Sequence, residues 1–240
     1  MFKAFRVVVV LCYFFFIALI GSLLCLFRPF NPDNTRICGR MFSWGGLKLL
    51  GMKITIEGAE QLTRLPPSVV VANHQDNRDL FVHGSIVPYR TVSIGKKILR
   101  YIPLFGQVYW LAGNILIDRS KTKQSVNAMT QTTIALKEKR TSIWVFAEGT
   151  RDKGEKLLPF KKGAFHMAID AGVPIVPICA SNYAKHTDLS NLHSGEVIIK
   201  VLAPISTQGM DKSDVSELMA STHAKMKETI SQLDARVLTK

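Results

Sequence analysis

The stretch VVVANHQDNRDLF, residues 70–82, places an apolar run directly before a cluster of ionisable side chains. The run at 68–73 is short and rich in Val, which is typical of a buried strand. His74, Asp76 and Asp79 follow within six residues of its end. Functional sites of α/β proteins gather beyond the carboxyl ends of strands, so this junction is the first candidate site.

Strand-like runs alternate with helical stretches along the rest of the chain. We expect strands at 53–57, 68–73, 91–94, 114–117, 142–146, 175–180 and 197–202. We expect helices at 121–139, 164–171 and 214–237. This alternation predicts an α/β fold with a mixed, largely parallel sheet that is flanked by helices.

The N-terminal segment contains a long apolar run, residues 7–27, without a charged residue. As a helix it would reach about 32 Å, against roughly 30 Å of bilayer hydrocarbon. The competing interpretation is a cleaved signal peptide, whose apolar core is only about 7–15 residues long and ends at small residues. This run ends in LCLFRPF, so a retained membrane-anchoring helix is favoured.

We therefore divide the chain into an N-terminal membrane-anchoring segment, residues 1–52, and an α/β domain, residues 53–240. Basic residues flank both ends of the apolar run, so the positive-inside rule gives no orientation. A second apolar stretch, residues 41–52, is too short to span a bilayer. It either lies in the membrane interface or packs on the domain.

The net charge of +13 is concentrated in one band of the sequence. Residues 90–162 contain fifteen Lys or Arg and five Asp or Glu. Such a band suits phosphodiesters, anionic lipid head groups or an acidic carrier protein. With an apolar anchor in the same chain, lipid phosphate is favoured and nucleic acid is not expected.

The four cysteines, Cys12, Cys25, Cys38 and Cys179, form no C-x-x-C pair and no metal-ligand spacing. We interpret them as reduced thiols, which suits a domain on the cytoplasmic side of a membrane.

The five-residue spacing of His74 and Asp79 restricts how they can meet. On a regular helix the two side chains would lie roughly 140° apart. They can pair if His74 lies in the strand-to-helix turn and Asp79 lies on the first helical turn. The carboxylate would then fix the imidazole tautomer and leave Nε2 as a base.

The chain has no G-x-S-x-G motif for a nucleophilic Ser, so we expect the substrate to bring the attacking hydroxyl. Two other interpretations stay open. His74 can be a structural residue at a strand end, with Asp79 as a helix cap. Alternatively, His74, Asp79 and His83 can form a metal site.

A second polar cluster, FAEGTR at 146–151, also follows an expected strand. Arg151 can bind a phosphate bidentately, and Gly149 permits close backbone approach. Glu148 can position a glycerol hydroxyl or hold the Arg. Further cationic candidates near strand or helix ends are Lys96, Arg119 and Lys161. Each alone is typical of a solvated surface charge, but together they predict a phosphate pocket beside His74.

Four blocks in fixed order carry a family resemblance: N-H-x4-D (73–79), GNILIDR (113–119), FAEGTR (146–151) and VPIVPI (173–178). Together they resemble the glycerolipid acyltransferases, most closely the bacterial 1-acyl-sn-glycerol-3-phosphate acyltransferases. The similarity runs from the anchor to about residue 205. It implies direct transfer of a fatty acyl group from acyl-CoA or acyl-carrier protein to the sn-2 hydroxyl of lysophosphatidate. Phosphatidate is the product, and no covalent acyl-enzyme, metal or redox cofactor is implied.

The resemblance also implies residue roles. His74 is the catalytic base and Asp79 orients it. The implied substrate-binding residues are Lys96, Arg119, Glu148, Gly149, Thr150, Arg151 and Lys161. Residues 173–178 match a block linked to the acyl group.

Two positions depart from the family pattern: Ala147 replaces the usual Pro, and Asp76 replaces a small polar residue. Asp76 is therefore a second carboxylate that can hold the imidazole, and we favour Asp79 because its spacing matches.

The resemblance places the chain in the cytoplasmic (inner) membrane, with its catalytic domain on the cytoplasmic side and in contact with anionic lipid. Glycerol 3-phosphate or another lysophospholipid is the alternative acceptor. Two alternatives of other classes are a non-catalytic anchored module that binds anionic lipid and an anchored hydrolase that uses His74 and water.

Overall fold

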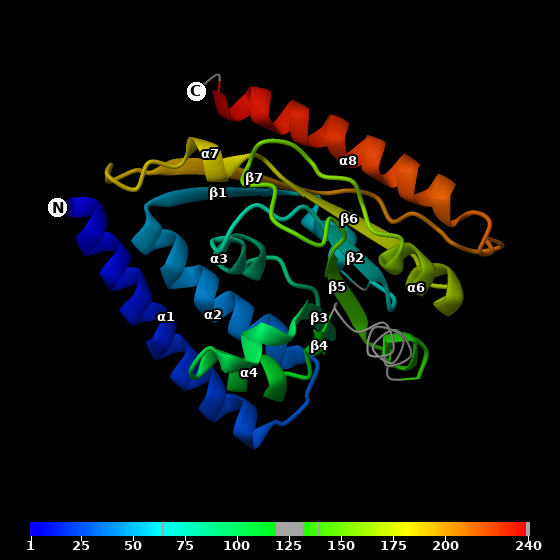
Figure 1. Cartoon of the computed structure of the whole chain (residues 1–240), viewed down its shortest axis with the longest axis horizontal. Coiled ribbons are helices and arrows are strands. Elements are labelled where there is room, and N and C mark those ends of the chain that lie inside the picture. Colours follow the sequence, from blue (N-terminus) through cyan, green and yellow to red (C-terminus); the bar gives the residue numbers. More distant parts are fainter. Residues whose placement is uncertain (64, 119–131, 139, 239–240) are drawn as a thin grey trace.

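A sheet of seven strands crosses the middle of the described part of the chain (Figure 1). The computed structural model describes residues 1–63, 65–118, 132–138 and 140–238. The strands, in sheet order, are β1 (Met52–Glu57), β7 (Gly195–Val201), β6 (Ile175–Ala180), β2 (Val69–Ala72), β5 (Ser142–Phe146), β3 (Thr91–Lys96) and β4 (Ile115–Ile117).

Five neighbouring strands, from β6 to β4 in sheet order, are mutually parallel. β7 pairs antiparallel with β6, and β1 pairs parallel with β7. The predicted mixed, largely parallel sheet is therefore confirmed. The parallel strands bring the carboxyl ends of β2, β3, β5 and β6 to one edge of the sheet.

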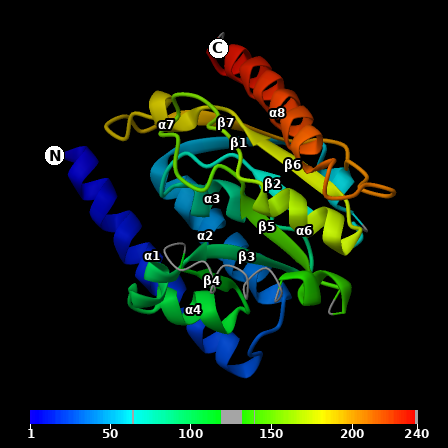
Figure 2. The same cartoon turned by 45° about the vertical axis from the view of Figure 1, so that its right-hand side comes forward.

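Helices cover both faces of the sheet (Figure 2). One face carries α1 (Phe2–Phe27), α2 (Asp33–Leu50), α3 (Asp79–Gly84), α4 (Phe105–Leu111) and the short α7 (Tyr183–His186). The other face carries α6 (Gly163–Ala171) and α8 (Val215–Leu238). Two 3-10 turns, η1 (Ala59–Leu62) and η2 (Lys97–Tyr101), lie between strands.

The side chains of β2 show why both faces are covered. Val70 and Ala72 point into the core under α1 to α4, whereas Val69 and Val71 point into the core under α6 and α8. All four are fully buried. Successive side chains of a strand alternate between faces, so a strand between two helical layers is apolar throughout.

The helices α2 and α3 cross at two glycines. A Cβ on Gly84 would lie 2.4 Å from the Gly39 carbonyl oxygen, and a Cβ on Gly39 would lie 3.2 Å from the Gly84 carbonyl oxygen. A methyl group does not fit at the first of these distances. This close approach presses α3 toward the sheet and so holds Asp79, its first residue, beside the end of β2.

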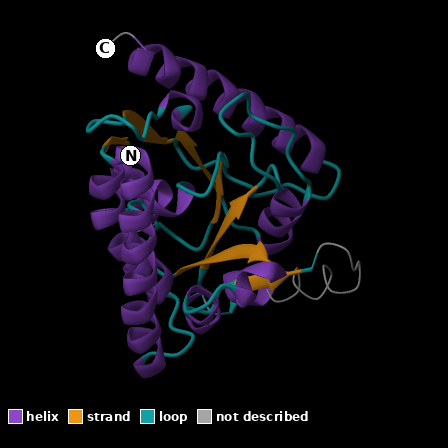
Figure 3. Cartoon of the chain, turned by 60° about the vertical axis from the view of Figure 1, so that its left-hand side comes forward, coloured by secondary structure: helices purple, strands orange, loops and turns teal. Residues whose placement is uncertain are grey.

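Among the described residues, one helix is long and apolar enough, by length and composition, to cross a membrane: the N-terminal helix α1. It packs along α2 and α4 (Figure 3). Its exposed side carries Phe5, Leu11, Phe16 and Leu23. Ile17, Ala18 and Cys25 are buried and share a core with β2, so this helix is part of the folded unit as well as an apolar surface.

Arg6 fastens the start of α1 to the loop before β7. The side chain is 6% exposed, and its guanidinium donates to the carbonyl oxygens of Leu189, Asn191 and Leu192 at 3.0, 2.6 and 2.9 Å. Three charge-assisted hydrogen bonds offset the cost of burying one cation.

The stretch 41–52, left open between an interfacial and a packed segment, forms the end of α2 and the start of β1. Phe42, Leu47 and Leu50 are buried in the core, whereas Trp44 is 71% exposed. The segment therefore packs on the domain with one aromatic ring left at the surface. Most of the predicted helix 121–139 lies outside the described residues.

Candidate functional site

The carboxyl ends of the parallel strands open onto a cavity of about 1300 Å³. Residues that follow β2, β3 and β5 form its polar lining: His74, Asp76, Arg78, Lys96, Gly149, Thr150, Arg151 and Lys153. Side chains of the N-terminal helices and of α4 form its apolar lining: Val7, Val10, Leu11, Phe14, Phe15, Phe42, Phe105 and Val108. The lining of the cavity thus contains both ionisable and apolar side chains.

His74 lies in the turn between β2 and α3, as its spacing from Asp79 predicts. Its Nδ1 lies 2.5 Å from Asp79 Oδ2, and its ring stacks on Phe146 with centroids 4.1 Å apart. The side chain is 20% exposed and borders the cavity. Because the carboxylate accepts a hydrogen bond from Nδ1–H, the lone pair of the neutral ring lies on Nε2.

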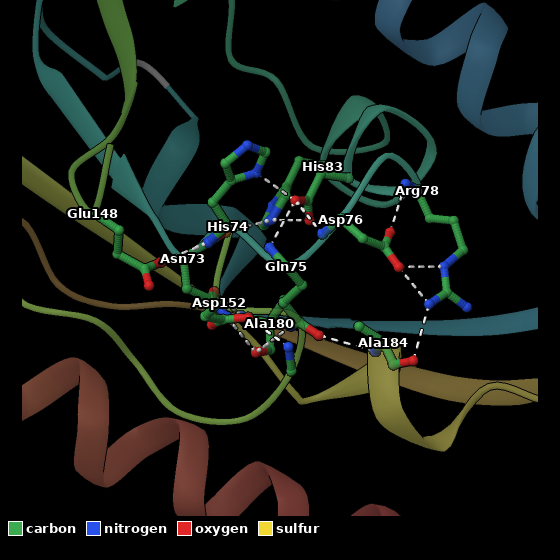
Figure 4. A network of polar contacts seen from close by, with 12 residues as sticks. Asn73, His74, Gln75, Asp76, Arg78, His83, Glu148, Asp152, Ala180 and Ala184 are labelled. Atoms are coloured by element: carbon green, nitrogen blue, oxygen red, sulfur yellow. Dashed lines mark hydrogen bonds and ion pairs between the residues drawn. The ribbon is translucent and has the colours of Figure 1, made fainter. Parts of the chain in front are cut away.

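Asp79 accepts hydrogen bonds from several donors of the turn that carries His74, Gln75 and Asp76 (Figure 4). Its Oδ2 also accepts the backbone N–H groups of Gln75 and Asp76 at 2.8 and 3.1 Å. The side chain is 4% exposed. The carboxylate thus closes the turn that holds His74 while it holds the imidazole itself.

The neighbouring Asp76 takes a different partner. Its Oδ2 accepts the Arg78 side-chain Nε–H at 2.8 Å and a second guanidinium N–H, and its Oδ1 accepts the Arg78 backbone N–H at 2.7 Å. Of the two carboxylates that the sequence left as candidates, the structure pairs Asp79 with the imidazole and Asp76 with Arg78.

Glu148 lies beneath His74 rather than in the cavity. It is 2% exposed, and its two carboxylate oxygens accept the backbone N–H groups of His74 and Leu158, each at 2.8 Å. Burial raises the pKa of Glu148 to about 8, against the lowering effect of these two donors. The side chain therefore joins the loop after β5 to the loop after β2, and its predicted contact with substrate stays a prediction.

The rest of the loop after β5 faces outward. Gly149 has a φ of 75°, a conformation that disfavours a side chain, and it turns the chain so that Thr150 and Arg151 border the cavity. Arg151 is exposed, and its side chain makes no hydrogen bond or ion pair with any residue that the structure describes. Ala147, at the usual Pro position, is 2% exposed and packs in the core behind.

The other predicted cations have different outcomes. Lys96, at the end of β3, borders the cavity. Lys161 is exposed and is not among the residues that line it. Arg119 lies outside the described residues. The neighbouring Asp118 lies 3.7 Å from the Nζ atom of Lys97, so the carboxylate at the end of the GNILID block has a cation beside it.

Sequence reasoning missed two residues of this site. Tyr183, at the start of α7, donates its hydroxyl to Asp79 Oδ1, and it is 1% exposed. Lys153 borders the cavity four residues beyond Gly149. Tyr183 lies 104 positions from Asp79 in the sequence, so no local spacing indicates the contact. A basic residue in a polar loop, such as Lys153, gives no signal that separates it from its neighbours.

The metal interpretation involves His74, Asp79 and His83, and the structure shows which atoms these three side chains contact. His83 Nε2 lies 3.1 Å from the Asn73 carbonyl oxygen and 3.5 Å from Asp79 Oδ1. No cluster of three or more His, Cys, Asp or Glu side chains suited to a metal ion occurs among the residues described. The His74 imidazole is therefore hydrogen-bonded to the carboxylate, whereas the His83 imidazole is hydrogen-bonded to the Asn73 carbonyl oxygen.

Comparison with known proteins points to one family. The sequence profile of a family described as acyltransferase matches residues 53–181. A 1-acyl-sn-glycerol-3-phosphate acyltransferase of Salmonella typhimurium is 42% identical over 97% of this chain and 95% of its own length. The protein of that name from Escherichia coli K12 is 41% identical over the same shares. A human 1-acyl-sn-glycerol-3-phosphate acyltransferase alpha is 36% identical over 85% of this chain and 72% of its own length.

A solved structure supports the fold independently. The crystal structure of the 1-acyl-sn-glycerophosphate (LPA) acyltransferase from Thermotoga maritima matches with a TM-score of 0.75 and 23% identity. The match covers 97% of this chain and 98% of that one. The apolar helix α1 and the bacterial relatives together indicate that the chain associates with a membrane.

Proposed function

This chain belongs to the acyltransferase family, and from that premise we propose that it acylates 1-acyl-glycerol 3-phosphate at the sn-2 hydroxyl to give phosphatidate. The acyl donor is a thioester, acyl-CoA or acyl-carrier protein. One observation carries the proposal: the His74–Asp79 pair borders a cavity whose lining combines cationic and apolar side chains. A lysophosphatidate molecule has two parts to match, a phosphomonoester and a hydrocarbon chain.

The reaction starts with His74 Nε2 as the general base. It takes the proton of the sn-2 hydroxyl, and Asp79 stabilises the imidazolium that forms. The glycerol oxygen attacks the thioester carbonyl, the carbon–sulfur bond breaks, and the thiolate leaves. The imidazolium returns its proton to the thiolate, so the products are phosphatidate and a thiol. A positioned base of this kind contributes on the order of 10²–10⁴ in rate.

The cations of the cavity lining are suited to the phosphate of the acceptor. Arg151 presents a guanidinium with no protein partner in the described structure, and Lys96 and Lys153 border the same cavity. A planar guanidinium binds two phosphate oxygens at once, which fixes the orientation of the glycerol as well as its distance. Arg119 and Lys161 remain proposed additional contacts, and Gly149 and Thr150 border the same cavity.

The cavity is also suited to fatty acyl chains. Phe14 and Phe15 of α1, Phe42 of α2 and Phe105 of α4 line it, and burial of each methylene stabilises a bound chain by about 0.8 kcal/mol. Because α1 also presents exposed apolar side chains, a chain can pass between bilayer and cavity without crossing water. We place the domain at the cytoplasmic face of the inner membrane, where thioester donors are available.

The test is a two-substrate assay on purified protein in phosphatidylglycerol-containing vesicles, with oleoyl-CoA and lysophosphatidate. We expect thiol release that needs the acceptor, formation of phosphatidate, and a loss of about 10²–10⁴ in kcat in His74→Ala. His193→Ala is the matched control because His193 is exposed and does not line the cavity.

Each alternative gives a different result. Thiol release without acceptor indicates a hydrolase. Vesicle binding without thiol release indicates a non-catalytic lipid-binding module. A higher kcat/KM with glycerol 3-phosphate than with lysophosphatidate reassigns the acceptor.

A further inference from the structure

The segment after β6 is tied to the catalytic turn by side chains of the turn itself. Asn73 accepts the Ala180 backbone N–H at 2.8 Å and donates to the Ala180 carbonyl oxygen at 3.0 Å. Gln75 donates to the Ser181 carbonyl oxygen at 2.8 Å and accepts the Ala184 backbone N–H at 3.0 Å. Asn73 and Gln75 are fully buried, so these bonds hold the start of α7 firmly against the turn.

The residue that this arrangement delivers is Tyr183. Its hydroxyl reaches Asp79 Oδ1, the carboxylate oxygen opposite the one that holds His74. Burial, and next the charge of Asp79, raise the pKa of Tyr183 well above its ordinary value. The hydroxyl therefore keeps its proton and donates a hydrogen bond to the carboxylate.

Asp79 has two imidazole neighbours, one on each oxygen. His74 Nδ1 lies 2.5 Å from Oδ2, and His83 Nε2 lies 3.5 Å from Oδ1. His83 is 3% exposed and packs against Trp144 and Phe146 of β5. Burial lowers the pKa of His83, the charge of Asp79 acts in the opposite direction, and a cationic His74 lowers it further.

His83 can share its Nε2–H with the carboxylate. This N–H donates to the Asn73 carbonyl oxygen at 3.1 Å, and the same nitrogen lies 3.5 Å from Asp79 Oδ1. A small turn of the Asp79 carboxylate, whose terminal torsion is soft, would bring Oδ1 within hydrogen-bond distance of Nε2. The same turn would lengthen the contact between Oδ2 and His74.

We propose that Tyr183 is a positioning residue, which holds Asp79 Oδ1 and so reserves the carboxylate for His74 against the buried imidazole of His83. This inference rests on the proposed acyl transfer and deepens it. Tyr183 does not touch substrate. It acts through Asp79 and determines which of the two imidazoles, His74 or His83, is hydrogen-bonded to the carboxylate.

The test compares Tyr183→Phe with Tyr13→Phe in the acceptor-dependent thiol-release assay. Both changes remove one hydrogen-bonded phenol hydroxyl, but Tyr13 bonds Met41 and Gly45 between α1 and α2 and does not line the cavity. In Tyr183→Phe we expect kcat to fall about ten- to hundredfold, the effect of one hydrogen bond to a charged group, with both KM values within about twofold.

The pH profile separates positioning from general damage. Without the Tyr183 donor the Asp79 carboxylate turns toward His83, its contact with His74 lengthens, and it stabilises the protonated His74 imidazole less. We therefore expect the acidic limb of kcat/KM to move to lower pH in Tyr183→Phe and to stay in place in Tyr13→Phe. An unchanged limb together with a kcat within about twofold of wild type overturns the inference.

A double-mutant comparison tests the competition itself. In a His83→Leu background no second imidazole can claim Oδ1, so Tyr183→Phe should cost severalfold less kcat than it does in the wild-type background. An equal loss in both backgrounds contradicts the role given to His83. Should His83→Leu fail to fold, as circular dichroism would show, the pH profile of the single variant decides. A wild-type protein without acceptor-dependent thiol release would instead refute the proposed function.

Discussion

The loop after β2 and the loop after β5 border the same cavity, but they treat their charges in opposite ways. In the first, Asp79 is bonded to His74 and Asp76 is bonded to Arg78, so each carboxylate already has its partners. In the second, the side chains of Arg151 and Lys153 border the cavity and make no hydrogen bond or ion pair with the residues that the structure describes. The difference separates chemistry from recognition. The base is oriented before substrate arrives, whereas the cations wait for an anion.

The most severe way to break this contrast is to remove the charge of the pre-organised loop with Asp79→Asn. The imidazolium then loses its counter-charge, and the amide cannot accept every donor that surrounds the carboxylate. We expect kcat to fall by roughly 10²–10⁴ with little change in either KM. Initial rates of thiol release measure this, with Asp170→Asn, an exposed carboxylate on α6, as control. A kcat above a third of wild type would refute the role of Asp79.

The loop after β5 is tested by Arg151→Ala, for which we expect a smaller and different effect. Loss of a bidentate guanidinium contact should raise the KM for lysophosphatidate about 10- to 100-fold and leave the KM for oleoyl-CoA near its wild-type value. Lys162→Ala, which removes an exposed cation outside the cavity lining, is the control. Equal increases in both KM values would show that Arg151 does not select the acceptor.

Glu148→Gln sharpens the comparison, because Glu148 connects the two loops. One of the two backbone N–H groups that its carboxylate accepts would face the new amide N–H₂, and we expect kcat to fall about tenfold. A lower kcat with unchanged KM values would support this positioning role. A raised acceptor KM alone would instead indicate direct contact with the glycerol.

The same variant should change how stability depends on pH. The folded pKa of Glu148, about 8, lies above its ordinary 4.5, so the folded state binds the extra proton between these values. The contribution of Glu148 to the free energy of unfolding is therefore fully present below pH about 4.5 and is lost as pH rises toward 8. In Glu148→Gln we expect a flatter thermal-melting profile from pH 6 to 8. Asp152, whose pKa burial raises to about 6, retains a shorter decline at lower pH.

Much of the fold could be predicted because its signals are local. All seven strands of the described sheet have bounds within two residues of the predicted ones, because short runs rich in Val and Ile are bounded by polar turns. The helix α4 was not predicted, since it has only seven residues and depends on packing against its neighbours for stability. The helix α2 was also missed, because its glycines have low helix propensity; Gly39 and Gly46 are explained by close packing against α3.

The candidate site divides in the same way. The pairing of His74 with Asp79 followed from a five-residue spacing that only a turn before a helix can close. The inward position of Glu148 did not, because a strand end next to an Arg suggests an exposed ion pair. The carboxylate faces two backbone N–H groups that come from residues 74 and 158.

By itself the sequence determined the kind of chemistry: an imidazole with a carboxylate five residues away, cations beyond several strand ends, and an apolar helix long enough for a membrane. These follow from residue type and short spacing, which the chain cannot alter on folding. Only the tertiary structure decided which oxygen of Asp79 serves which partner, because Tyr183 and His83 reach it through separate elements. Contacts between distant segments depend on how helices and sheet pack, and packing leaves no periodic trace in the sequence.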